Sequence, residues 1–486
     1  MNLIGAQSIL ATSIILLSTS CNKEPTVAPS NDNNYLEEAI SIDEEEKILL
    51  YNGDGANLPQ EKLYLGGDEV VLLVDSTNQI TLGEPYDSEW RGNSYTFYRT
   101  ELPIIKVNTR SNRDVHEVYE SSQFALIENG QVTLTGDLGI KLRGNTSLSF
   151  PKKSYRIELW ENSQGLRNRD ASIFNMRSDD DWLLDGMWNE PLSVRDKSAM
   201  ELWLDFGRVH YADEEEDVVL GAAREYCELL INGSYQGLYY IGERLDRKQL
   251  KLETYTDSSN GGELYKAKGW DKAVIAFSLP EFDNNNPNWG GYEIKYPEEV
   301  GTYDWGKLKE FIEFFKGSIP NDFDETYSEK IDVDNIVDYF IFINVLNAYD
   351  NNGNNIYVAR RNQASPYYFV SWDYDATLGL NIFGKELTRI DDFLHHVVTR
   401  KLIGSATFRT KLKERWEQLR SGILESDNIK SYYRSNYAKL LRNGVYEREG
   451  MISRLEKASP DSTAISYLER SLDERLQYLD KAFREL

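Results

Sequence analysis

The residues best suited to chemistry lie in one polar stretch and at the end of the strand pattern that follows it. Asp350 and Asn355 stand five positions apart, and Asp373 follows a run of β-forming residues. Phosphoryl transfer requires a carboxylate that orients or deprotonates the attacking hydroxyl. It also requires an amide and a second carboxylate that hold Mg²⁺ against the phosphates. The spacing therefore predicts a metal and nucleotide site with Asp350 beside the attacking hydroxyl and Asn355 and Asp373 on the metal.

A helix and a hairpin must position these side chains. Apolar residues recur at helical spacing before the polar stretch, at Ile336, Val337, Phe340, Ile343 and Leu346. β-Forming residues then fill 356–359 and 367–372, with turn residues between the two runs. We therefore expect a buried helix to end just before Asp350 and a β-hairpin to return two aspartates beside the polar loop.

A lysine in a strand could supply positive charge for the phosphates. In the strand expected before Trp160, alternation places Lys153 on the apolar face and Lys152 on the solvated face. An ammonium that points into a core requires an anion, which could be a structural carboxylate or a phosphate. The polar turn 143–147 directly upstream favours the phosphate, so we predict that Lys153 contacts a nucleotide.

The composition limits the classes of function. The chain has 486 residues, of which 40% are hydrophobic and 12% aromatic, enough for a large core. Its formal net charge of −26 argues against general nucleic-acid binding, which needs a basic surface. The same charge means that an ATP site must gather its positive charge locally.

The N-terminus has the pattern of an export signal. Residues 1–20 contain no Lys, Arg, Asp or Glu, and their apolar run is too short to span a bilayer. Leu17-Ser-Thr-Ser-Cys21 resembles the lipobox of bacterial lipoproteins, which implies acylation of Cys21; the alternative is an ordinary signal peptide with a chance cysteine. We expect residues 21–47 to form a flexible tether and residues 48–101 a β-rich appendage.

Other chemistries receive less support. The sequence contains no Walker A motif, G-x-G-x-x-G motif or G-x-S-x-G elbow, and its four histidines lack metal-ligand spacing. The stretch from Asp350 to Asn355 could instead be a polar turn or a calcium loop, although the terminal Glu of an EF-hand is missing. The many acidic residues single out no glycosidase pair at a defined separation.

Four separated motifs give a more specific indication. They are Arg143-Gly-Asn-Thr-Ser with Pro151-Lys-Lys-Ser-Tyr, Trp182-Leu-Leu with Leu192-Ser-Val-Arg-Asp, Ile231-Asn-Gly-Ser-Tyr-Gln-Gly-Leu-Tyr with Glu243, and Asp350 to Asn355 with Trp372-Asp-Tyr-Asp-Ala-Thr-Leu-Gly379. Together they resemble the CotH kinase-like family, which consists of secreted or spore-coat atypical protein kinases. The chain lacks the glycine loop, the His-Arg pair and the Asp-Phe-Gly motif of ordinary protein kinases.

The resemblance implies a divergent kinase that binds ATP with Mg²⁺ or Mn²⁺ and phosphorylates hydroxyl side chains of extracytoplasmic proteins. By motif, Asp350 is the implied catalytic aspartate, and the implied metal ligands are Asn355, Asp373 and, as a further candidate, Asp375. The residues implied to contact the nucleotide phosphates are Lys153, Arg143 and Arg195. Glu201, on the following helix, is expected to pair with Lys153.

The expected fold class is α+β. We predict a divergent protein-kinase-like two-lobe domain over residues 102–480, with the β appendage before it. Its β-rich N-lobe would cover about 102–248, and its mostly helical C-lobe about 249–480.

The function expected first is that of an atypical Ser/Thr protein kinase. Its predicted partners are a nucleotide and a protein phosphoacceptor, without nucleic acid, and it would contact a membrane only through its lipid anchor. The expected location is a bacterial cell envelope, on the periplasmic face or the cell surface. The alternative is a non-catalytic surface lipoprotein that binds glycan or protein, with Trp270 and Trp289 stacking on sugar rings.

Overall fold

The computed structural model describes residues 36, 38–55, 62–74, 79–256, 261–268, 279–299, 301, 303–316, 322–387, 391–455 and 459–486. These residues belong to one compact unit, Tyr35–Leu486. The predicted signal peptide, Cys21 and the first part of the predicted tether lie outside the described residues.

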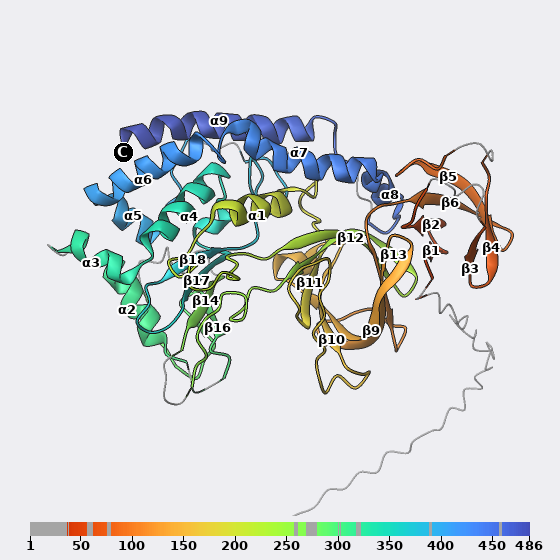
Figure 1. Ribbon diagram of the computed structural model, residues 1–486, viewed down its shortest axis with the longest axis horizontal. Helices are drawn as coiled ribbons and strands as arrows, with labels where there is room; N and C mark the ends of the chain where they lie inside the picture. The colour runs from red at the N-terminus through yellow and green to blue at the C-terminus, as the bar shows by residue number, and fades with distance from the viewer. Residues whose placement is uncertain are drawn as a thin grey trace, which may run out of the picture. The chain divides into compact units, whose positions relative to one another are not determined.

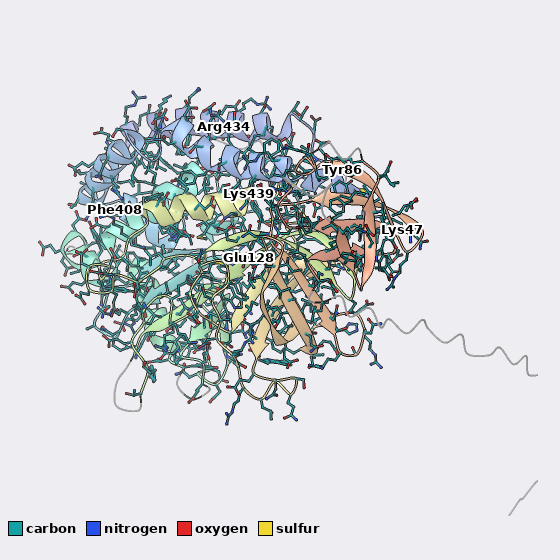
Figure 2. All side chains as sticks on the ribbon, turned by 45° about the vertical axis from the view of Figure 1, so that its right-hand side comes forward. Lys47, Tyr86, Glu128, Phe408, Arg434 and Lys439 are labelled. Atoms are coloured by element: carbon teal, nitrogen blue, oxygen red, sulfur yellow. The ribbon has the colours of Figure 1, made fainter. Side chains whose placement is uncertain are left out.

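The N-terminal part of the described chain is a mixed sheet (Figure 1). Its strands lie in the order β1-β2-β6-β5-β4-β3, with bounds Ile40–Asp43 (β1), Ile48–Tyr51 (β2), Leu63–Leu65 (β3), Asp68–Leu72 (β4), Pro85–Trp90 (β5) and Asn93–Arg99 (β6). β2 and β6 run parallel, whereas β1 and β2 pair antiparallel. Lys47 and Tyr86 mark this sheet in Figure 2. The sheet occupies the segment predicted as a β-rich appendage.

The predicted tether, however, extends too far. The prediction placed residues up to 47 in the tether, but every residue of β1 is buried and β1 pairs with β2. Ile40 and Ile42 enter the apolar core of the sheet. The Asp43 carboxylate accepts hydrogen bonds from the N–H groups of Glu45 and Glu46, each at 2.9 Å. The acidic run is thus a structured turn between two paired strands, because Asp43 caps it.

The next strands close into a barrel in the order β10-β11-β13-β12-β7-β8-β9. Their bounds are Ile104–Thr109 (β7), Glu120–Glu128 (β8), Gln131–Arg143 (β9), Ser154–Trp160 (β10), Asp181–Asp185 (β11), Arg224–Ile231 (β12) and Ser234–Glu243 (β13), with the 3₁₀ turn η2 at Thr146–Ser149. Parallel pairing of β12 with β7 places the first barrel strand of the chain beside the last but one. Alternate residues such as Tyr155, Ile157 and Leu159 fill the interior.

A second sheet and a set of helices form the C-terminal part. The strands lie in the order β15-β16-β14-β17-β18, with bounds Glu263–Ala267 (β14), Asn288–Trp289 (β15), Tyr292–Tyr296 (β16), Ile356–Arg360 (β17) and Tyr368–Ser371 (β18). The helices are Arg195–Phe206 (α1), Trp305–Lys316 (α2), Phe323–Lys330 (α3), Val333–Val345 (α4), Val397–Ile403 (α5), Ala406–Arg420 (α6), Ser426–Arg442 (α7), Val445–Met451 (α8) and Ala464–Glu485 (α9), with the 3₁₀ turn η3 at Asp350–Asn352.

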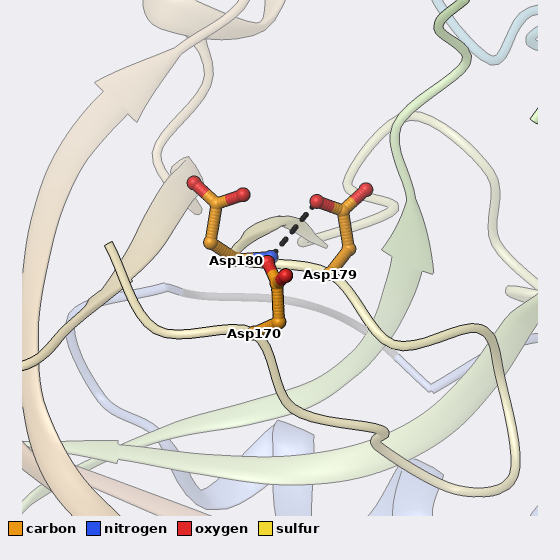
Figure 3. Close-up of side chains that lie close together, drawn as sticks. All are labelled: Asp170, Asp179 and Asp180. Atoms are coloured by element: carbon orange, nitrogen blue, oxygen red, sulfur yellow. Dashed lines mark hydrogen bonds between the residues drawn. The ribbon is translucent and has the colours of Figure 1, made fainter. Parts of the chain in front are cut away.

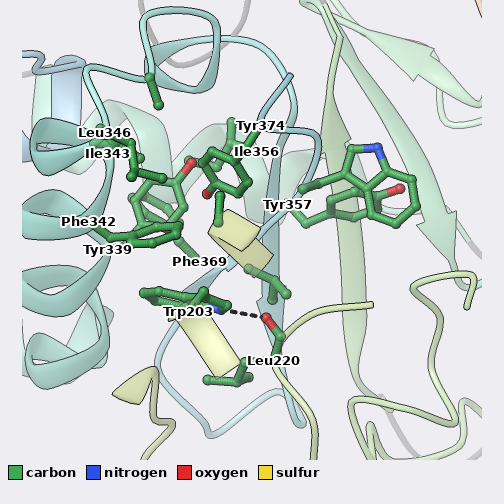
Figure 4. Close-up of a cluster of buried hydrophobic side chains, with 14 of the residues drawn as sticks. Trp203, Leu220, Tyr339, Phe342, Ile343, Leu346, Ile356, Tyr357, Phe369 and Tyr374 are labelled. Atoms are coloured by element: carbon green, nitrogen blue, oxygen red, sulfur yellow. Dashed lines mark hydrogen bonds between the residues drawn. The ribbon is translucent and has the colours of Figure 1, made fainter. Parts of the chain in front are cut away.

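An aromatic core joins α1 to α4 (Figure 4). Trp203 of α1 packs on Phe342 of α4, with ring centroids 5.1 Å apart, and meets Tyr339 edge-on at 6.1 Å. The Trp203 indole N–H donates to the carbonyl of Leu220 at 2.7 Å. α4 also packs against β18. This core holds the start of α1 and the end of α4, which both lead to the site described below.

The C-terminal helices contact α1 and the barrel. α7 and α9 lie side by side, and α7 also packs on α1 (Figure 1). Lys439 of α7 pairs with Glu225 of β12 at 3.7 Å. Short helix α8 packs against barrel strand β13. The predicted mixed α+β class, with a β-rich N-terminal region and helices toward the C-terminus, is confirmed; the division into two kinase-like lobes stays a prediction. None of the helices in the described ranges combines the length and apolar composition that a bilayer crossing demands.

Candidate active site

A cavity of about 610 Å³ lies where the barrel, the start of α1 and the second sheet meet. Its lining contains Arg143 at the end of β9 and the predicted residues Asp350, Asn355, Asp373 and Asp375. Side chains that are far apart in the sequence, from Arg143 to Asp375, therefore line the same cavity. The structure groups these predicted site residues as the sequence analysis expected.

The loop after α4 fixes Asp350. Asp350 begins the turn η3, and its Oδ2 accepts hydrogen bonds from the side-chain amides of Asn355 at 2.7 Å and Asn354 at 3.2 Å. Asn355 has φ +50°, a left-handed conformation that asparagine tolerates better than most residues. The run of asparagines thus has two functions, since it permits the turn and orients the Asp350 carboxylate.

The hairpin β17–β18 delivers the other aspartates to the same cavity. Ile356 pairs with Ser371, so the start of β17 lies beside the end of β18. The Asn351 amide donates to the carbonyls of Trp372 at 2.6 Å and Asp373 at 3.2 Å. This amide ties the Asp350 loop to the strand end that carries Asp373.

Two aspartates that the sequence analysis missed enlarge the acidic side of the cavity. Asp185 ends β11 and pairs with Arg143 at 3.0 Å. Asp196, in the first turn of α1, pairs with Arg224 at 2.6 Å and accepts from the N–H of Tyr374 at 2.6 Å. The Leu192-Ser-Val-Arg-Asp motif ends on Asp196, and this was the available signal for it.

The crowding of carboxylates has an electrostatic consequence. Burial, together with the neighbouring negative charges of Asp196 and Asp185, raises the pKa of Asp373 to about 7. Burial, and then Asp373, raise the pKa of Asp375 well above its usual range. Among the described residues, none donates a hydrogen bond to the Asp373 carboxylate, whereas Asp375 accepts one from Asn189 at 2.6 Å. An all-oxygen cluster with excess negative charge fits a hard divalent cation such as Mg²⁺ or Mn²⁺.

The structure contradicts the prediction for Lys153. β10 begins at Ser154, so Lys152 and Lys153 precede the strand and its alternation does not extend to them. The Lys153 ammonium donates to the carbonyls of Leu148 at 2.8 Å and Phe150 at 2.6 Å. The described lining of the cavity includes Lys152 instead. Lys153 therefore stabilises the turn upstream of β10 and does not face the carboxylates.

Lys152 reaches the cavity from a buried position. Its side chain and that of Glu449 are each 2% exposed, and the two form an ion pair. The Lys152 ammonium also donates to the carbonyl of Leu238, and Glu449 accepts from the N–H of Leu238 at 3.1 Å. Glu449 belongs to α8, so a helix near the C-terminus holds a lysine that precedes β10. Spacing in the sequence gave no signal for this pair.

Lys266 of β14 is a second lysine that the sequence analysis missed. It lines the cavity together with Lys268. Burial lowers the pKa of Lys266 to about 8, against the opposing effect of the Asp373 carboxylate. The signal was present in the strand pattern, because residues two apart in a strand share a face. Lys266 in β14 and Lys268 directly after it lie on one side of this segment, and two lysines together indicate an anion beside them.

Two further predictions are contradicted. Buried Arg195 forms an ion pair with Glu190 and donates to the carbonyl of Thr377 at 3.1 Å. Glu201 pairs with Lys197 at 2.7 Å. Neither Arg195 nor Glu201 belongs to the cavity lining in the described part of the chain. Arg195 is buried at the start of α1. The expected pair of Glu201 with Lys153 is absent because Glu201 pairs with Lys197 and the Lys153 ammonium donates to backbone carbonyls upstream of β10.

A second group of aspartates lies elsewhere, before β11 (Figure 3). Carboxylate oxygens of Asp170, Asp179 and Asp180 lie within 4.8 Å of one another. Arg177 pairs with Asp179 at 2.5 Å, and Lys248 lies 3.6 Å from it. Arg177 and Lys248 thus offset the charge of Asp179, whereas Asp373 forms no ion pair with any residue that the structure describes. We therefore do not treat it as the metal site.

The cavity has the residue types of a metal-dependent phosphoryl-transfer centre, with acids and amides facing lysines and an arginine. The family model described as CotH kinase protein matches residues 140–479 of the sequence. The chain belongs to this family, as its motifs predicted. A relative, the inner spore coat protein H of Bacillus subtilis (strain 168), is 22% identical over 317 residues, which are 64% of this chain and 76% of the relative.

Proposed function

We propose that the protein is a Mg-ATP-dependent phosphotransferase, an atypical protein kinase that acts on Ser or Thr of extracytoplasmic proteins. One observation supports this most strongly: the Asp350 loop, Asp373 and Asp375 meet Lys152 and Lys266 in a single cavity. Family membership supports a kinase-like protein independently. In this proposal the substrates are ATP and a hydroxyl-bearing polypeptide.

Asp350 would act on the acceptor. In the transfer, the acceptor oxygen forms a bond to the γ-phosphorus, the bond from that phosphorus to the bridging oxygen breaks, and ADP leaves. The hydroxyl proton passes to the Asp350 carboxylate. The amides of Asn354 and Asn355 donate to Oδ2 of Asp350 and thereby orient the carboxylate that would receive the proton.

Asp373 and Asp375 would hold the metal, with Asn355 as a further ligand. The bound cation would neutralise charge on the phosphates, and Mn²⁺ suits the same oxygen donors. Asp373 fits this role because its carboxylate lies in the cavity and accepts no hydrogen bond from the described residues. Asn189 fixes one oxygen of Asp375 and thereby orients it.

The cations would bind the phosphates. Lys266 enters the cavity from β14 and Lys268 from the residue after this strand, whereas Lys152 comes from the turn before β10 and Arg143 from the end of β9. Fixed positive charges in a site with little water stabilise phosphate charge without reorganisation during the reaction. These side chains supply positive charge locally, which a phosphate site requires because the chain as a whole has a formal net charge of −26.

One of the two tryptophans considered for glycan binding is buried. Trp289 is 5% exposed, and its indole N–H donates to the carbonyl of Pro280 at 3.1 Å. A ring in that position offers no face for stacking on a sugar. Trp270, the other tryptophan considered, lies outside the described residues.

We also propose that the protein is lipid-anchored in a bacterial cell envelope through Cys21. The lipobox pattern supports this, as does the relative whose name refers to the inner spore coat. Metabolic labelling with a palmitate analogue should mark the wild-type protein and not Cys21→Ala. Equal labelling of both would contradict the anchor.

The phosphotransferase proposal is tested by phosphate transfer from radiolabelled ATP to Ser/Thr peptides. Asp350→Asn should retain nucleotide binding and lower the transfer rate by about 10²–10⁴-fold, the usual contribution of a general base. Asp170→Asn, in the neutralised aspartate cluster, is the matched control and should transfer at the wild-type rate. Undiminished transfer by Asp350→Asn would overturn the role assigned to that residue.

A further inference from the structure

A turn beside the cavity, Asn381–Lys385, is built tightly although it lies at the surface. The N–H of Asn381 donates to the carbonyl of Lys385 at 2.9 Å, and the N–H of Gly384 donates to the carbonyl of Asn381 at 2.9 Å. The Asn381 side chain accepts from the N–H of Phe383 at 2.9 Å and from that of Lys385 at 3.2 Å. This network fixes the backbone on which Ile382 and Phe383 stand.

The turn is also joined directly to the proposed metal ligands. One amide group, that of Asn189, donates to Asp375 Oδ2 at 2.6 Å and to the carbonyl of Ile382 at 3.0 Å. Gly384 has φ +69°, and a Cβ there would lie 2.0 Å from the carbonyl oxygen of Asn189. Only glycine permits this approach. The turn therefore has a defined position relative to Asp375.

The side chains that the turn presents are apolar and exposed. Phe383 is 59% exposed and Ile382 is 36% exposed, and Ile382 is part of the cavity lining. Tyr349, which directly precedes Asp350, is 46% exposed. A hydrogen-bonded turn that holds large apolar side chains in water at the edge of a site indicates a surface that is covered when a partner binds.

The position of the turn indicates what covers it. An acceptor must bring its hydroxyl to Asp350, so the atoms flanking that hydroxyl must pass over the edge of the cavity. In an extended polypeptide, successive residues advance by about 3.3 Å, so a side chain one to three residues away reaches about 3–10 Å along the edge. Carbohydrate acceptors would present hydroxyl groups there, which Ile382 and Phe383 cannot satisfy.

We propose that Asn381–Lys385 is the acceptor-recognition element of this enzyme, in which Ile382 and Phe383 pack on an apolar side chain close to the acceptor Ser or Thr of a polypeptide. The inference rests on the proposed phosphotransferase function and specifies its acceptor. Phe383 is a specificity residue and takes no part in the transfer itself, because it lies outside the cavity lining that the structure describes.

The test uses the full chain and two synthetic Ser peptides that differ at one neighbouring position, Leu in one and Gln in the other. For wild type, kcat/KM should be at least tenfold higher with the Leu peptide. Phe383→Ser should remove this preference by raising the KM for the Leu peptide, while the KM for ATP and the rate with the Gln peptide stay unchanged. Phe383→Leu should restore most of the preference, because it restores an apolar contact.

The control variant is Leu166→Ser, which changes a side chain that is 78% exposed in a loop of the barrel. It should keep the wild-type preference. Transfer by Phe383→Ser with an unchanged Leu-to-Gln ratio would overturn the acceptor inference and leave the phosphotransferase proposal standing. Absence of transfer to any peptide, together with absence of nucleotide binding by wild type, would overturn the proposed function and this inference with it.

Discussion

Replacement of either of two neighbouring lysines by methionine should lower stability and nucleotide affinity to very different extents. Lys153→Met removes hydrogen bonds to two carbonyls of a partly exposed turn, which should cost about 1–2 kcal/mol of unfolding free energy. Lys152→Met leaves the Glu449 carboxylate buried without its cation. Loss of one partner of a buried pair costs about 3–5 kcal/mol.

The same two variants differ in the affinity for nucleotide. A charged hydrogen bond to a phosphate contributes about 1.5–3 kcal/mol, so Lys152→Met should weaken binding of Mg²⁺ with a nonhydrolysable ATP analogue by about 10- to 150-fold. Lys153→Met should bind within about twofold of wild type, because its ammonium faces away from the cavity. Urea unfolding measures the first effect, and isothermal titration calorimetry the second.

A double variant separates folding from binding. Lys152→Met with Glu449→Gln removes both charges of the pair, and the glutamine can still accept from the N–H of Leu238. This variant should recover most of the lost stability while its nucleotide affinity stays low. A larger loss of affinity in Lys153→Met than in Lys152→Met would refute the lysine assignment.

Three further predictions concern pH and the buried ion pairs. Burial lowers the pKa of His396 to about 3 from 6.5, so the free energy of unfolding should fall as pH drops below about 6.5, by about 2 kcal/mol at pH 5. In urea unfolding, this free energy should fall less steeply with pH in His396→Asn than in His116→Asn. Equal pH dependence in the two variants would contradict this. Burial lowers the pKa of Lys266 to about 8, so this lysine should lose its charge between pH 7 and 9 and nucleotide affinity measured by calorimetry should decline. Lys266→Arg should suppress the decline, because the guanidinium stays charged. An equally steep decline in the variant would count against contact between Lys266 and the phosphates. Arg448 and Glu228 form a fully buried ion pair, and Arg448→Met would leave the Glu228 carboxylate buried without its cation. The free energy of unfolding in urea should therefore fall by about 3–5 kcal/mol. A change under about 1 kcal/mol would show that this pair contributes little to stability.

Local sequence predicted the acidic side of the site because its constraints are local. The polar loop follows a helix with a clear apolar period, and a short hairpin leaves little choice about where Asp373 returns. Asparagines suit the left-handed turn that brings their amides to Asp350. Helix, loop and hairpin therefore determine the position of these residues without information from the rest of the chain.

The cationic side depended on facts that spacing does not contain. Lys152 and Lys153 exchange roles because β10 begins after them, so the alternation of the strand does not decide which way their side chains point. The partner of Lys152 lies 297 positions away in α8, and no local pattern indicates that contact. Arg195 was assigned to the phosphates from a motif, but tertiary packing buried it against Glu190.

We propose that the Asp373 side of the cavity binds a divalent cation that in turn binds the nucleotide. Calorimetric titration of a nonhydrolysable ATP analogue, with and without Mg²⁺, into wild type and Asp373→Asn tests it most directly. We expect one binding site in wild type with Mg²⁺, and binding weakened at least tenfold both when Mg²⁺ is omitted and in Asp373→Asn. Equal affinity of the wild type and the variant, or binding indifferent to Mg²⁺, would contradict the claim.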